Sequence, residues 1–432
     1  MTADGRDPLN ETDHATLAGL VRELLLVGQL VDRAGMPALL GEFGVDGMRD
    51  VAIEEWQAAS PHYTTRMKRA LRITGDGVAE IFKGFQLDVG APPEFMDFRY
   101  EVRDHDHGGF HLDHCGALVD VEPMGDDLVR TMCHDIEDPT FPATALATNP
   151  RARVEPVHRP PRRPADRTPH CAWEVVIDPA AEPARPYPPT LAVADRRAVS
   201  FAFPEPGPRP AGEPGHLDDY SGPLLADLRF ADFTGDALVR IAREVYLQIH
   251  LLALGFDLAV CARTDVDTAD RLLTAQCEGI AGVASERLSA LLRDRGVAGA
   301  ELVRATLALH PLFGPAHYTG ARVGAGTGGA AAEITVDPAA AAAEDDCWAR
   351  CLRPGPEGEA PAAVLAAARG VDPRAEVEVA ERPGPDGPRT VLVVRLGGVE
   401  HPVAESVALT RLSTGTDFRF GPDRPLLPIT PA

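Results

Sequence analysis

Thiols, imidazoles and carboxylates are concentrated in one segment of the chain. Seven of the 14 histidines and three of the seven cysteines lie within residues 105–171, where His and Cys are adjacent three times, at 114–115, 133–134 and 170–171. Thiolate and neutral imidazole, together with a carboxylate, form either a zinc or iron site or a metal-free set of nucleophile, base and orienting group. The spacing matches no strong metal, P-loop or serine-hydrolase signature, so both interpretations stay open.

The first His-Cys pair lies in a segment that we expect to be a strand. Side chains alternate between the two faces of a strand, so His111, Asp113 and Cys115 are predicted on one face and His114 on the other. One face would then carry a ligand set or a nucleophile beside a base. Residues 105–107 contain two further histidines and precede two glycines, and we expect a solvated turn there.

The second pair lies in a segment, 125–139, that carries helix signals at both ends. Asp126 is a candidate N-cap and Pro139 a candidate stop. In a helix, Cys133 and His134 lie four and three residues before Glu137, so a thiol, an imidazole and a carboxylate share one side. In a strand, Cys133 would instead share a face with the carboxylate two residues on, at position 135, opposite the imidazole.

Arginines in a proline-rich segment are candidates for substrate binding. Residues 156–164 hold three arginines and one histidine among prolines. Arg159 and Arg162 could hold a substrate carboxylate, because a guanidinium group matches a carboxylate in both charge and geometry. An exposed extended linker is the competing interpretation.

The elements that must position these side chains occur twice in the sequence. Helical periodicity opens the chain at 17–27 and recurs at 238–252. Further helices are expected at 64–72, 77–84, 285–294 and 299–309, and strands at 98–103, 110–121 and 171–177. Identities recur at shifts of 218 to 223 positions, as for Arg66 with Arg287 and for the Pro-Arg after Asn149 and Asp372. We predict an α+β fold of two related modules, each with helices first and an antiparallel sheet after, as a degenerate internal duplication.

Three segments follow from this interpretation. Residues 1–178 form an N-terminal α+β module with the His/Cys cluster, 179–225 a linker or covering segment rich in Pro and Gly, and 226–432 a degenerate C-terminal α+β module. The second module lacks the His-bearing pairs: residues 332–336 stand opposite 111–115, and Arg389 and Thr390 stand opposite His170 and Cys171. It is therefore expected to serve packing, closure or regulation rather than catalysis.

Composition bounds the class of partner. The chain has 42 Lys and Arg against 65 Asp and Glu, a formal net charge of −23, and no basic run interleaved with aromatic residues, so we expect neither nucleic acid nor a membrane as partner. The longest apolar stretch, 246–262, is interrupted by polar residues and is expected to be too short to span a bilayer. The odd number of cysteines argues against a disulfide framework. We predict a cytoplasmic protein with a small-molecule substrate, and leave a homodimer open.

One segment resembles a known family. Cys115, then Cys133, His134 and Asp135, then Asn-Pro at 149–150, and then Cys171 before an aromatic strand follow an order that is similar to the L-2-amino-thiazoline-4-carboxylic acid hydrolase family, over residues 95–178. The resemblance implies that Cys115, Cys133, Asp135 and Cys171 line a small pocket where a C–N bond of a heterocyclic or amide-like substrate is hydrolysed. The additional histidines at 111, 114, 134 and 170 would suit a metal site.

Three hypotheses result. The first is a hydrolase acting on a C–N bond of a small carboxylated heterocycle or amide, in which Cys133, His134 and Asp135 react, Cys115 and Cys171 lie opposite, and Arg159 or Arg162 binds the carboxylate. The second is a zinc- or iron-dependent, oxidative or other biosynthetic enzyme that uses His114, Cys115, His134, Glu137 and His170. The third is a non-enzymatic protein that binds or senses a small ligand.

Overall fold

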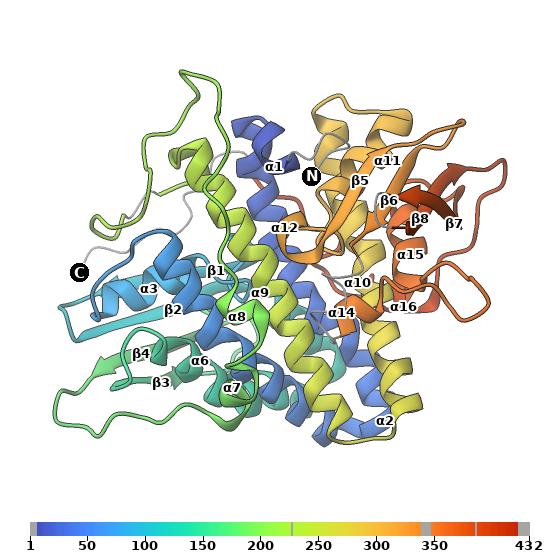
Figure 1. Ribbon diagram of the computed structural model, residues 1–432. Helices are drawn as coiled ribbons and strands as arrows, with labels where there is room; N and C mark the ends of the chain where they lie inside the picture. The colour runs from blue at the N-terminus through green and yellow to red at the C-terminus, as the bar shows by residue number, and fades with distance from the viewer. Residues whose placement is uncertain (1–6, 226–227, 338–346, 385–386, 422–432) are drawn as a thin grey trace.

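The computed structural model describes residues 7–225, 228–337, 347–384 and 387–421 and has an α+β architecture (Figure 1). The first half contains α1 (Pro8–Glu11), α2 (His14–Ala70), α3 (Val78–Gln86), β1 (Met96–Val102), β2 (His107–Cys115), α4 (Gly116–Val121), η1 (Glu122–Met124), α5 (Asp126–Arg130), η2 (Thr131–Ile136), α6 (Glu137–Leu146), β3 (Ala152–His158), β4 (Cys171–Ile177), α7 (Pro188–Val193) and α8 (Arg197–Ser200). The second half contains η3 (Phe230–Asp232), α9 (Gly235–Cys261), α10 (Val266–Asp294), α11 (Gly299–Ala308), α12 (Ala316–Thr319), β5 (Ala321–Ala325), β6 (Ala332–Val336), α14 (Cys347–Arg350), α15 (Ala362–Val371), β7 (Ala375–Gly384), β8 (Gly387–Leu396) and α16 (Glu405–Thr410).

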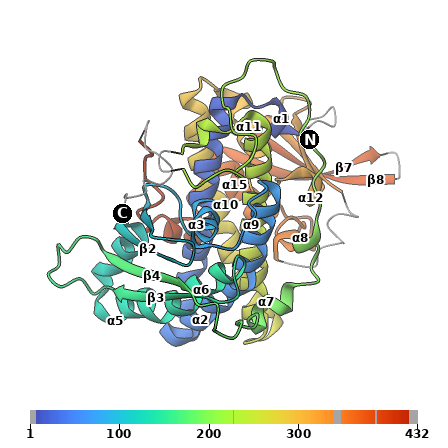
Figure 2. The same cartoon turned by 90° about the vertical axis from the view of Figure 1, so that its left-hand side faces the viewer.

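Two antiparallel four-stranded sheets lie on opposite sides of the long helices α2, α9 and α10 (Figures 1 and 2). The strand orders are β1-β2-β4-β3 and β5-β6-β8-β7, so both sheets place their strands in the same sequence of neighbours. The expected α+β class is therefore confirmed, and each sheet follows its helices along the chain.

Helix α2 is longer than the two separate helices expected at its ends. Asp13 caps it by accepting a hydrogen bond from the Thr16 N–H at 3.0 Å. The helical run reaches Ala70 with one interruption at Gly44, where φ is 68°, a conformation that L-residues avoid. The kink divides α2 into a buried first arm and a second arm that leads to the first sheet.

Helix α2 packs against α9 at very short range. A Cβ added to Gly35 would lie 2.6 Å from the Phe256 ring, and one added to Gly255 would lie 2.8 Å from the backbone oxygen of Glu55. Glycine is required at both positions because any larger side chain would push the helices apart.

Two buried ion pairs join the halves in a reciprocal way. Arg66 of α2 contacts Glu244 of α9 through two hydrogen bonds of 2.8 and 3.0 Å. Arg287 of α10 contacts Glu23 of α2 at 2.7 Å. The four side chains are 14 % exposed or less, so each charge depends on its partner.

The first sheet buries one face against α3 and α6. Phe82, Phe110, Phe141 and Trp173 form an aromatic layer there, with neighbouring ring centroids 4.9 to 6.4 Å apart. The predicted strand at 98–103 is found as β1, and the one at 171–177 as β4. The strand expected at 110–121 ends at Cys115, and residues 116–121 form helix α4 instead.

A bulge changes which face Cys115 occupies. Between the pairs Met96–Cys115 and Phe98–Leu112, β2 has one more residue than β1. An extra residue reverses the alternation of side chains beyond it. Cys115 is therefore buried, whereas His111 and Asp113 lie partly exposed on the outer face, and the prediction that these three share a face is wrong.

The helical run that carries Cys133 is also different from the expectation. Gly125, not Asp126, is the N-cap of α5, and the run continues through the π-helical turn η2 into α6 instead of stopping at Pro139. Pro139 is the third residue of α6 and follows directly after the π-helical turn, within the continuous helical run. A helix rather than a strand is thus present here.

Residues 179–225 lie along the outside of α2 and α9 (Figure 1). The Thr190 hydroxyl donates to the Gln57 carbonyl at 2.6 Å, and the Val199 carbonyl accepts from Arg66 at 3.0 Å. We call residues 199–206 the first strap. Residues 416–421, the second strap, lie in the same manner over Arg287 and Arg22, where the Thr416 carbonyl accepts from Arg287 at 2.9 Å and that of Gly421 accepts from Arg22 at 2.9 Å.

Helices α2 and α9 are long and apolar enough to cross a membrane by length and composition. Most of the stretch at 246–262 belongs to α9, which has 27 residues. Contrary to our expectation, the length of this helix does not exclude a membrane span. Of the most apolar windows of α2 and α9, 78 % and 89 % are buried inside the protein. Core helices meet the same criterion, and the cytoplasmic location stays a prediction.

The Arg66–Glu244 pair should be important for stability. We expect Arg66→Met to lower the free energy of unfolding by about 3–5 kcal/mol, because it leaves the Glu244 carboxylate buried without a partner. Urea unfolding followed by circular dichroism measures the change. Arg271→Met, which removes the exposed pair with Glu42, is the matched control and should change the value by less than about 1 kcal/mol. Equal effects of the two variants would contradict the role of the buried pair.

Candidate functional site

A cavity of about 60 Å³ lies between α2, α3 and the η2–α6 run. Its wall combines aromatic and sulfur-containing side chains with a group of buried charged ones. The charged lining residues are Asp32, Arg33, Asp88 and Glu137. Such a mixture of apolar walls and few convergent polar groups is typical of a small-molecule site.

Arg33 is the central cation of this cavity. It is 9 % exposed, and among the described residues its guanidinium group donates only to sulfur atoms, to Met36 Sδ at 3.1 Å and to Met132 Sδ at 3.6 Å. Within the described part of the chain no carboxylate lies within ion-pair distance of it. Thioethers are weak acceptors, so most of the hydrogen-bonding capacity of Arg33 is unused.

Acidic side chains surround Arg33 at longer range. Burial, opposed by Arg33, raises the pKa of Glu137 to about 7 and also raises that of Asp32. Burial and the charge of Asp32 raise the pKa of Glu55 well above its usual value, and Glu55 Oε1 has no hydrogen-bond partner among the described residues. The cavity therefore holds a guanidinium group beside carboxyl groups whose pKa values burial raises, that of Glu137 to about 7.

Asp88 closes the cavity on the side of α3. Its carboxyl group accepts hydrogen bonds from the Tyr63 hydroxyl at 2.8 Å and from the Gly90 N–H at 2.7 Å. Burial raises the pKa of Asp88 to about 6 in spite of these bonds.

The three thiols predicted for the site lie near one another behind this cavity. The Cys133 and Cys171 thiols both lie within the electrostatic influence of Cys115 and Glu137. Burial raises the pKa of Cys115 to about 12 and the pKa values of Cys133 and Cys171 well above their usual range. A thiol of this kind is protonated at neutral pH and is a poor nucleophile.

His134 and Asp135 point away from these thiols. His134 Nε2 donates to the Pro160 carbonyl at 2.6 Å, and Asp135 is exposed. Cys133, His134 and Asp135 form no hydrogen-bonded triad within the described chain. The interpretation of these three neighbours as one reacting group therefore finds no geometric support.

Both arginines that the sequence offers for substrate binding are held in ion pairs outside the cavity. Arg162 forms two 2.7 Å hydrogen bonds to Glu122, and Arg159 is paired with Asp138 and lies 5.9 Å from the Trp173 ring centroid. Neither lines the cavity. Their hydrogen bonds to carboxylates leave them less suited than Arg33 to bind a substrate carboxylate.

The proposed metal ligands do not converge. His114 and His170 have ring centroids 5.8 Å apart, and His170 Nε2 accepts from Arg162 at 3.3 Å. His134 is bonded to a carbonyl elsewhere, and Glu137 faces the cavity. In residues 7–225, 228–337, 347–384 and 387–421, no group of three or more His, Cys, Asp and Glu side chains could hold a metal ion. The residues therefore do not fit a zinc or iron centre.

Of the residues predicted for the site, Glu137 alone lines the cavity. Asp32, Arg33, Glu55 and Asp88 were missed. The signal that could have found two of them is the adjacent pair Asp32-Arg33 inside an apolar helical run, because charges at buried helix positions need a specific reason.

The chain matches no family model, no curated protein and no solved structure. The features of the site therefore rest on its own geometry.

The buried thiols should react slowly. We expect iodoacetamide to modify the exposed Cys261 of the native protein first and the buried Cys115 and Cys133 only on unfolding, with the half-buried Cys171 slower than Cys261, because accessibility limits the reaction and burial raises the pKa of all three thiols of the first sheet. Mass spectrometry of peptides after timed labelling distinguishes the sites. Early modification of Cys133 in the folded protein would show that it is an activated nucleophile.

Titration of Glu137 should make stability depend on pH. Its folded pKa is raised, so the folded state favours the protonated form, and stability falls as the pH rises from about 4.5 toward 7. We expect Glu137→Gln to reduce the loss of unfolding free energy between pH 5 and 8 by about 2 kcal/mol relative to wild type. Urea unfolding at a series of pH values measures it, and parallel pH profiles of the two proteins would contradict the prediction.

Proposed function

We propose that the protein is a hydrolase that cleaves a C–N bond of a small carboxylated heterocycle or amide, and that the cavity beside Arg33 and Glu137 is its active site. The observation that carries the proposal is a buried guanidinium group without a carboxylate partner, next to a carboxyl group whose pKa is about 7. The proposal keeps the reaction type that the family resemblance implies, but the reacting group is the Glu137 carboxyl group instead of a cysteine thiol.

The energetics of Arg33 favour an anionic ligand. A buried charge without a hydrogen-bonded counterion is costly, and a ligand carboxylate could supply two parallel hydrogen bonds to the guanidinium group. Burial raises the pKa of Asp32 and of Glu55, so it disfavours the charged forms that would compete with a ligand for the guanidinium group.

Glu137 has the pKa that general acid–base catalysis needs. As a carboxylate it would take a proton from water while the hydroxide part adds to the carbon of the C–N bond. As a carboxylic acid it would then return the proton to the leaving nitrogen as the C–N bond breaks. One water is consumed, and Glu137 regains its initial state. The thiols of Cys115, Cys133 and Cys171 lie behind it and take no part.

We also propose that the chain is an internal duplication, as the repeated identities predict. The shared strand order of the two sheets supports it. The two reciprocal ion pairs also support the duplication. Arg66 corresponds to Arg287, and Glu23 corresponds to Glu244, each at a shift of 221 positions. The turns before β3 and β7 agree as well: the side chains of Asn149 and Asp372 accept from the second N–H after them at 2.9 and 3.0 Å.

A comparison of the two halves supports a functional role for the charged cavity. At the same shift of 221 positions, charged residues of the first half are replaced by uncharged buried ones in the second. The corresponding pairs are Asp32 with Ala253, Arg33 with Leu254, Glu55 with Gln276 and Asp88 with Leu309. The fold therefore does not need the charges, and their retention in one half favours chemistry there.

Turnover of 2-aminothiazoline-4-carboxylate, followed by chromatography of substrate and product, tests the proposal. We expect Glu137→Gln to lower kcat by about 100-fold or more, since it removes a general base. The wild-type kcat should rise with pH through about 7, and this rise should be absent in the variant. Arg33→Met should mainly raise KM.

Cys133→Ser is the matched control, because it changes a neighbour of Glu137 that the mechanism does not use. Full activity of this variant supports the carboxyl mechanism, and loss of activity would favour a thiol nucleophile. Binding of the compound without turnover would favour the alternative of a ligand-binding or sensor protein.

A further inference from the structure

A second pocket, of about 330 Å³, lies where the end of α2 meets the start of α9 under the first strap. Five of its lining residues are arginines: Arg66, Arg69, Arg72, Arg240 and Arg243. Arg66 and Arg69 are three residues apart on α2, Arg240 and Arg243 are three residues apart on α9, and Arg72 follows the C-terminal end of α2. In a chain with net charge −23 this is an unusual concentration of cations.

Two of these arginines build the pocket. Arg66 is bonded to Glu244, and Arg243 is bonded to Asp7 at 2.6 Å and to the Pro204 carbonyl of the strap at 2.7 Å. Both guanidinium groups lie over the Phe203 ring, at 5.8 and 5.7 Å from its centroid. They hold the strap on the helices and have few donors left for a ligand.

The other three arginines are less engaged. Arg69 is exposed, and its side chain forms no hydrogen bond and no ion pair within 4.0 Å with any residue that the structure describes, although its charge acts on Glu244. Arg240 donates to the Asp218 backbone carbonyl and has no carboxylate within ion-pair distance in that part of the chain. Arg72 lies 3.5 Å from Asp219 and is 78 % exposed. Counting Asp7, Glu205, Asp219 and Glu244, five arginines face four carboxylates, and the surplus charge lies at Arg69 and Arg240.

The corresponding place in the other half provides an internal comparison. There Arg287, Arg22, Glu23 and Phe420 reproduce the building residues, with Arg287 and Arg22 at 5.8 and 4.4 Å from the Phe420 ring centroid. The positions of Arg69 and Arg240, however, are Ala290 and Gly19. A Cβ at Gly19 would meet the Leu291 side chain at 2.9 Å, so Leu291 occupies the space next to Gly19. The framework is needed in both halves, whereas the two additional cations are not.

We propose that the pocket at Arg69 and Arg240 binds a small phosphate monoester. The guanidinium forks of Arg69, Arg240 and Arg72 match phosphate oxygens, and the Phe201 and Phe203 rings offer an apolar wall to the organic part of the ligand. The exposed Glu205 carboxylate on the strap would accept from a hydroxyl group of that part. The site is separate from the cavity at Arg33 and does not depend on the proposed hydrolase activity.

Calorimetric titration of the full chain with phenyl phosphate, inorganic phosphate and benzoate tests the proposal. We expect phenyl phosphate to bind more tightly than the other two probes. The double variant Arg69→Gln/Arg240→Gln should weaken its binding about tenfold or more, since charge-assisted hydrogen bonds are lost.

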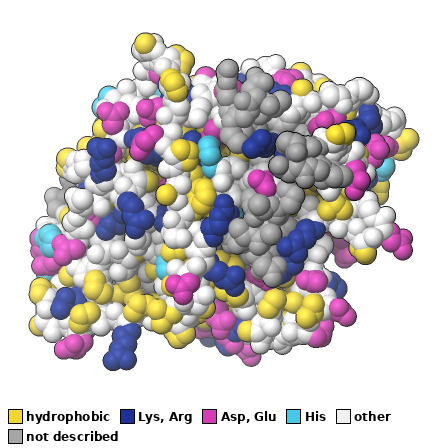
Figure 3. All heavy atoms as spheres, in the orientation of Figure 1, with side chains coloured by type: hydrophobic (Ala, Val, Ile, Leu, Met, Phe, Trp, Pro, Cys, Tyr) yellow, Lys and Arg dark blue, Asp and Glu magenta, His cyan; other side chains and the backbone are white. Residues whose placement is uncertain are grey.

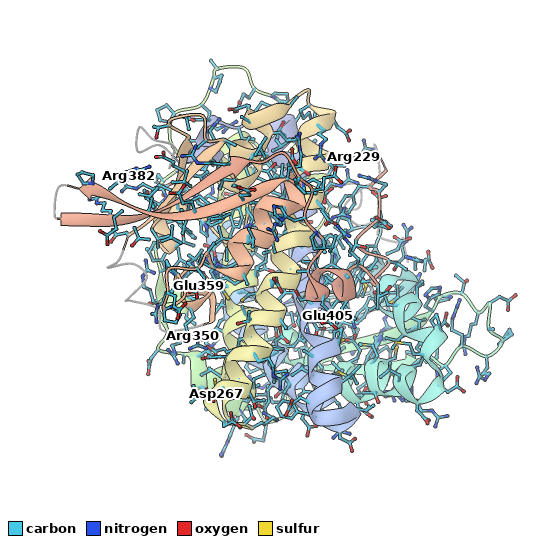
Figure 4. All side chains as sticks on the ribbon, turned by 90° about the vertical axis from the view of Figure 1, so that its right-hand side faces the viewer. Arg229, Asp267, Arg350, Glu359, Arg382 and Glu405 are labelled. Atoms are coloured by element: carbon cyan, nitrogen blue, oxygen red, sulfur yellow. The ribbon has the colours of Figure 1, made fainter. Side chains whose placement is uncertain are left out.

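Two control variants make the result specific. Arg382→Gln removes an exposed arginine at the tip of the β7–β8 hairpin, far from the helices (Figure 4), and should leave binding unchanged. Arg33→Met should also leave it unchanged, which separates this pocket from the cavity. The proposal is overturned if phenyl phosphate does not bind at millimolar concentration, if benzoate binds equally well, or if the double variant binds as wild type does.

Discussion

The close packing of α2 against α9 is the constraint on which the rest of the structure depends. Glycines at positions 35 and 255 bring the two backbones together, the buried Arg66–Glu244 pair joins α2 to α9, and the buried Arg287–Glu23 pair joins α10 to α2. Each sheet is attached to its own side of this helix layer (Figure 2). The same packing shapes the cavity, since Gly35 lies two residues after Arg33 and a Cβ at Gly255 would meet the backbone of Glu55.

The cavity concentrates charge beneath a surface that, on the face in Figure 3, carries basic and acidic side chains interspersed without a broad field of one sign. Inside the cavity, Arg33 is buried and Glu137 is partly buried, and charges interact more strongly in such a setting than in water. We therefore expect contacts within the cavity to determine which ligand binds.

The sequence predicts the local elements better than the site. The α+β class and the strands around Phe98 and Trp173 follow from periodicity and residue type. The face of Cys115 could not be predicted, because a bulge in β2 depends on its pairing with β1. Local rules predict that Pro139 ends the helix, whereas the helical run continues through the π-helical turn into α6.

The charged cavity escaped prediction for a different reason. Its acids come from positions as far apart as 32 and 137 and are ordinary residues in a chain with 65 acidic side chains. Their significance lies in burial, which only the packing of α2 creates. The conspicuous histidines, by contrast, lie mostly on the outer parts of the first sheet, where hydrogen bonds to carbonyls and carboxylates account for several of them.

The first strap has a consequence for how the two halves are connected. It is part of the single covalent link between the sheets, yet it lies on the outside of the helix layer, while the association of the halves is made inside by α2 and α9. The covalent connection between the halves and the contact that holds them together therefore lie in different parts of the molecule. The contact between α2 and α9 therefore determines the arrangement of the two sheets more directly than the covalent connection does.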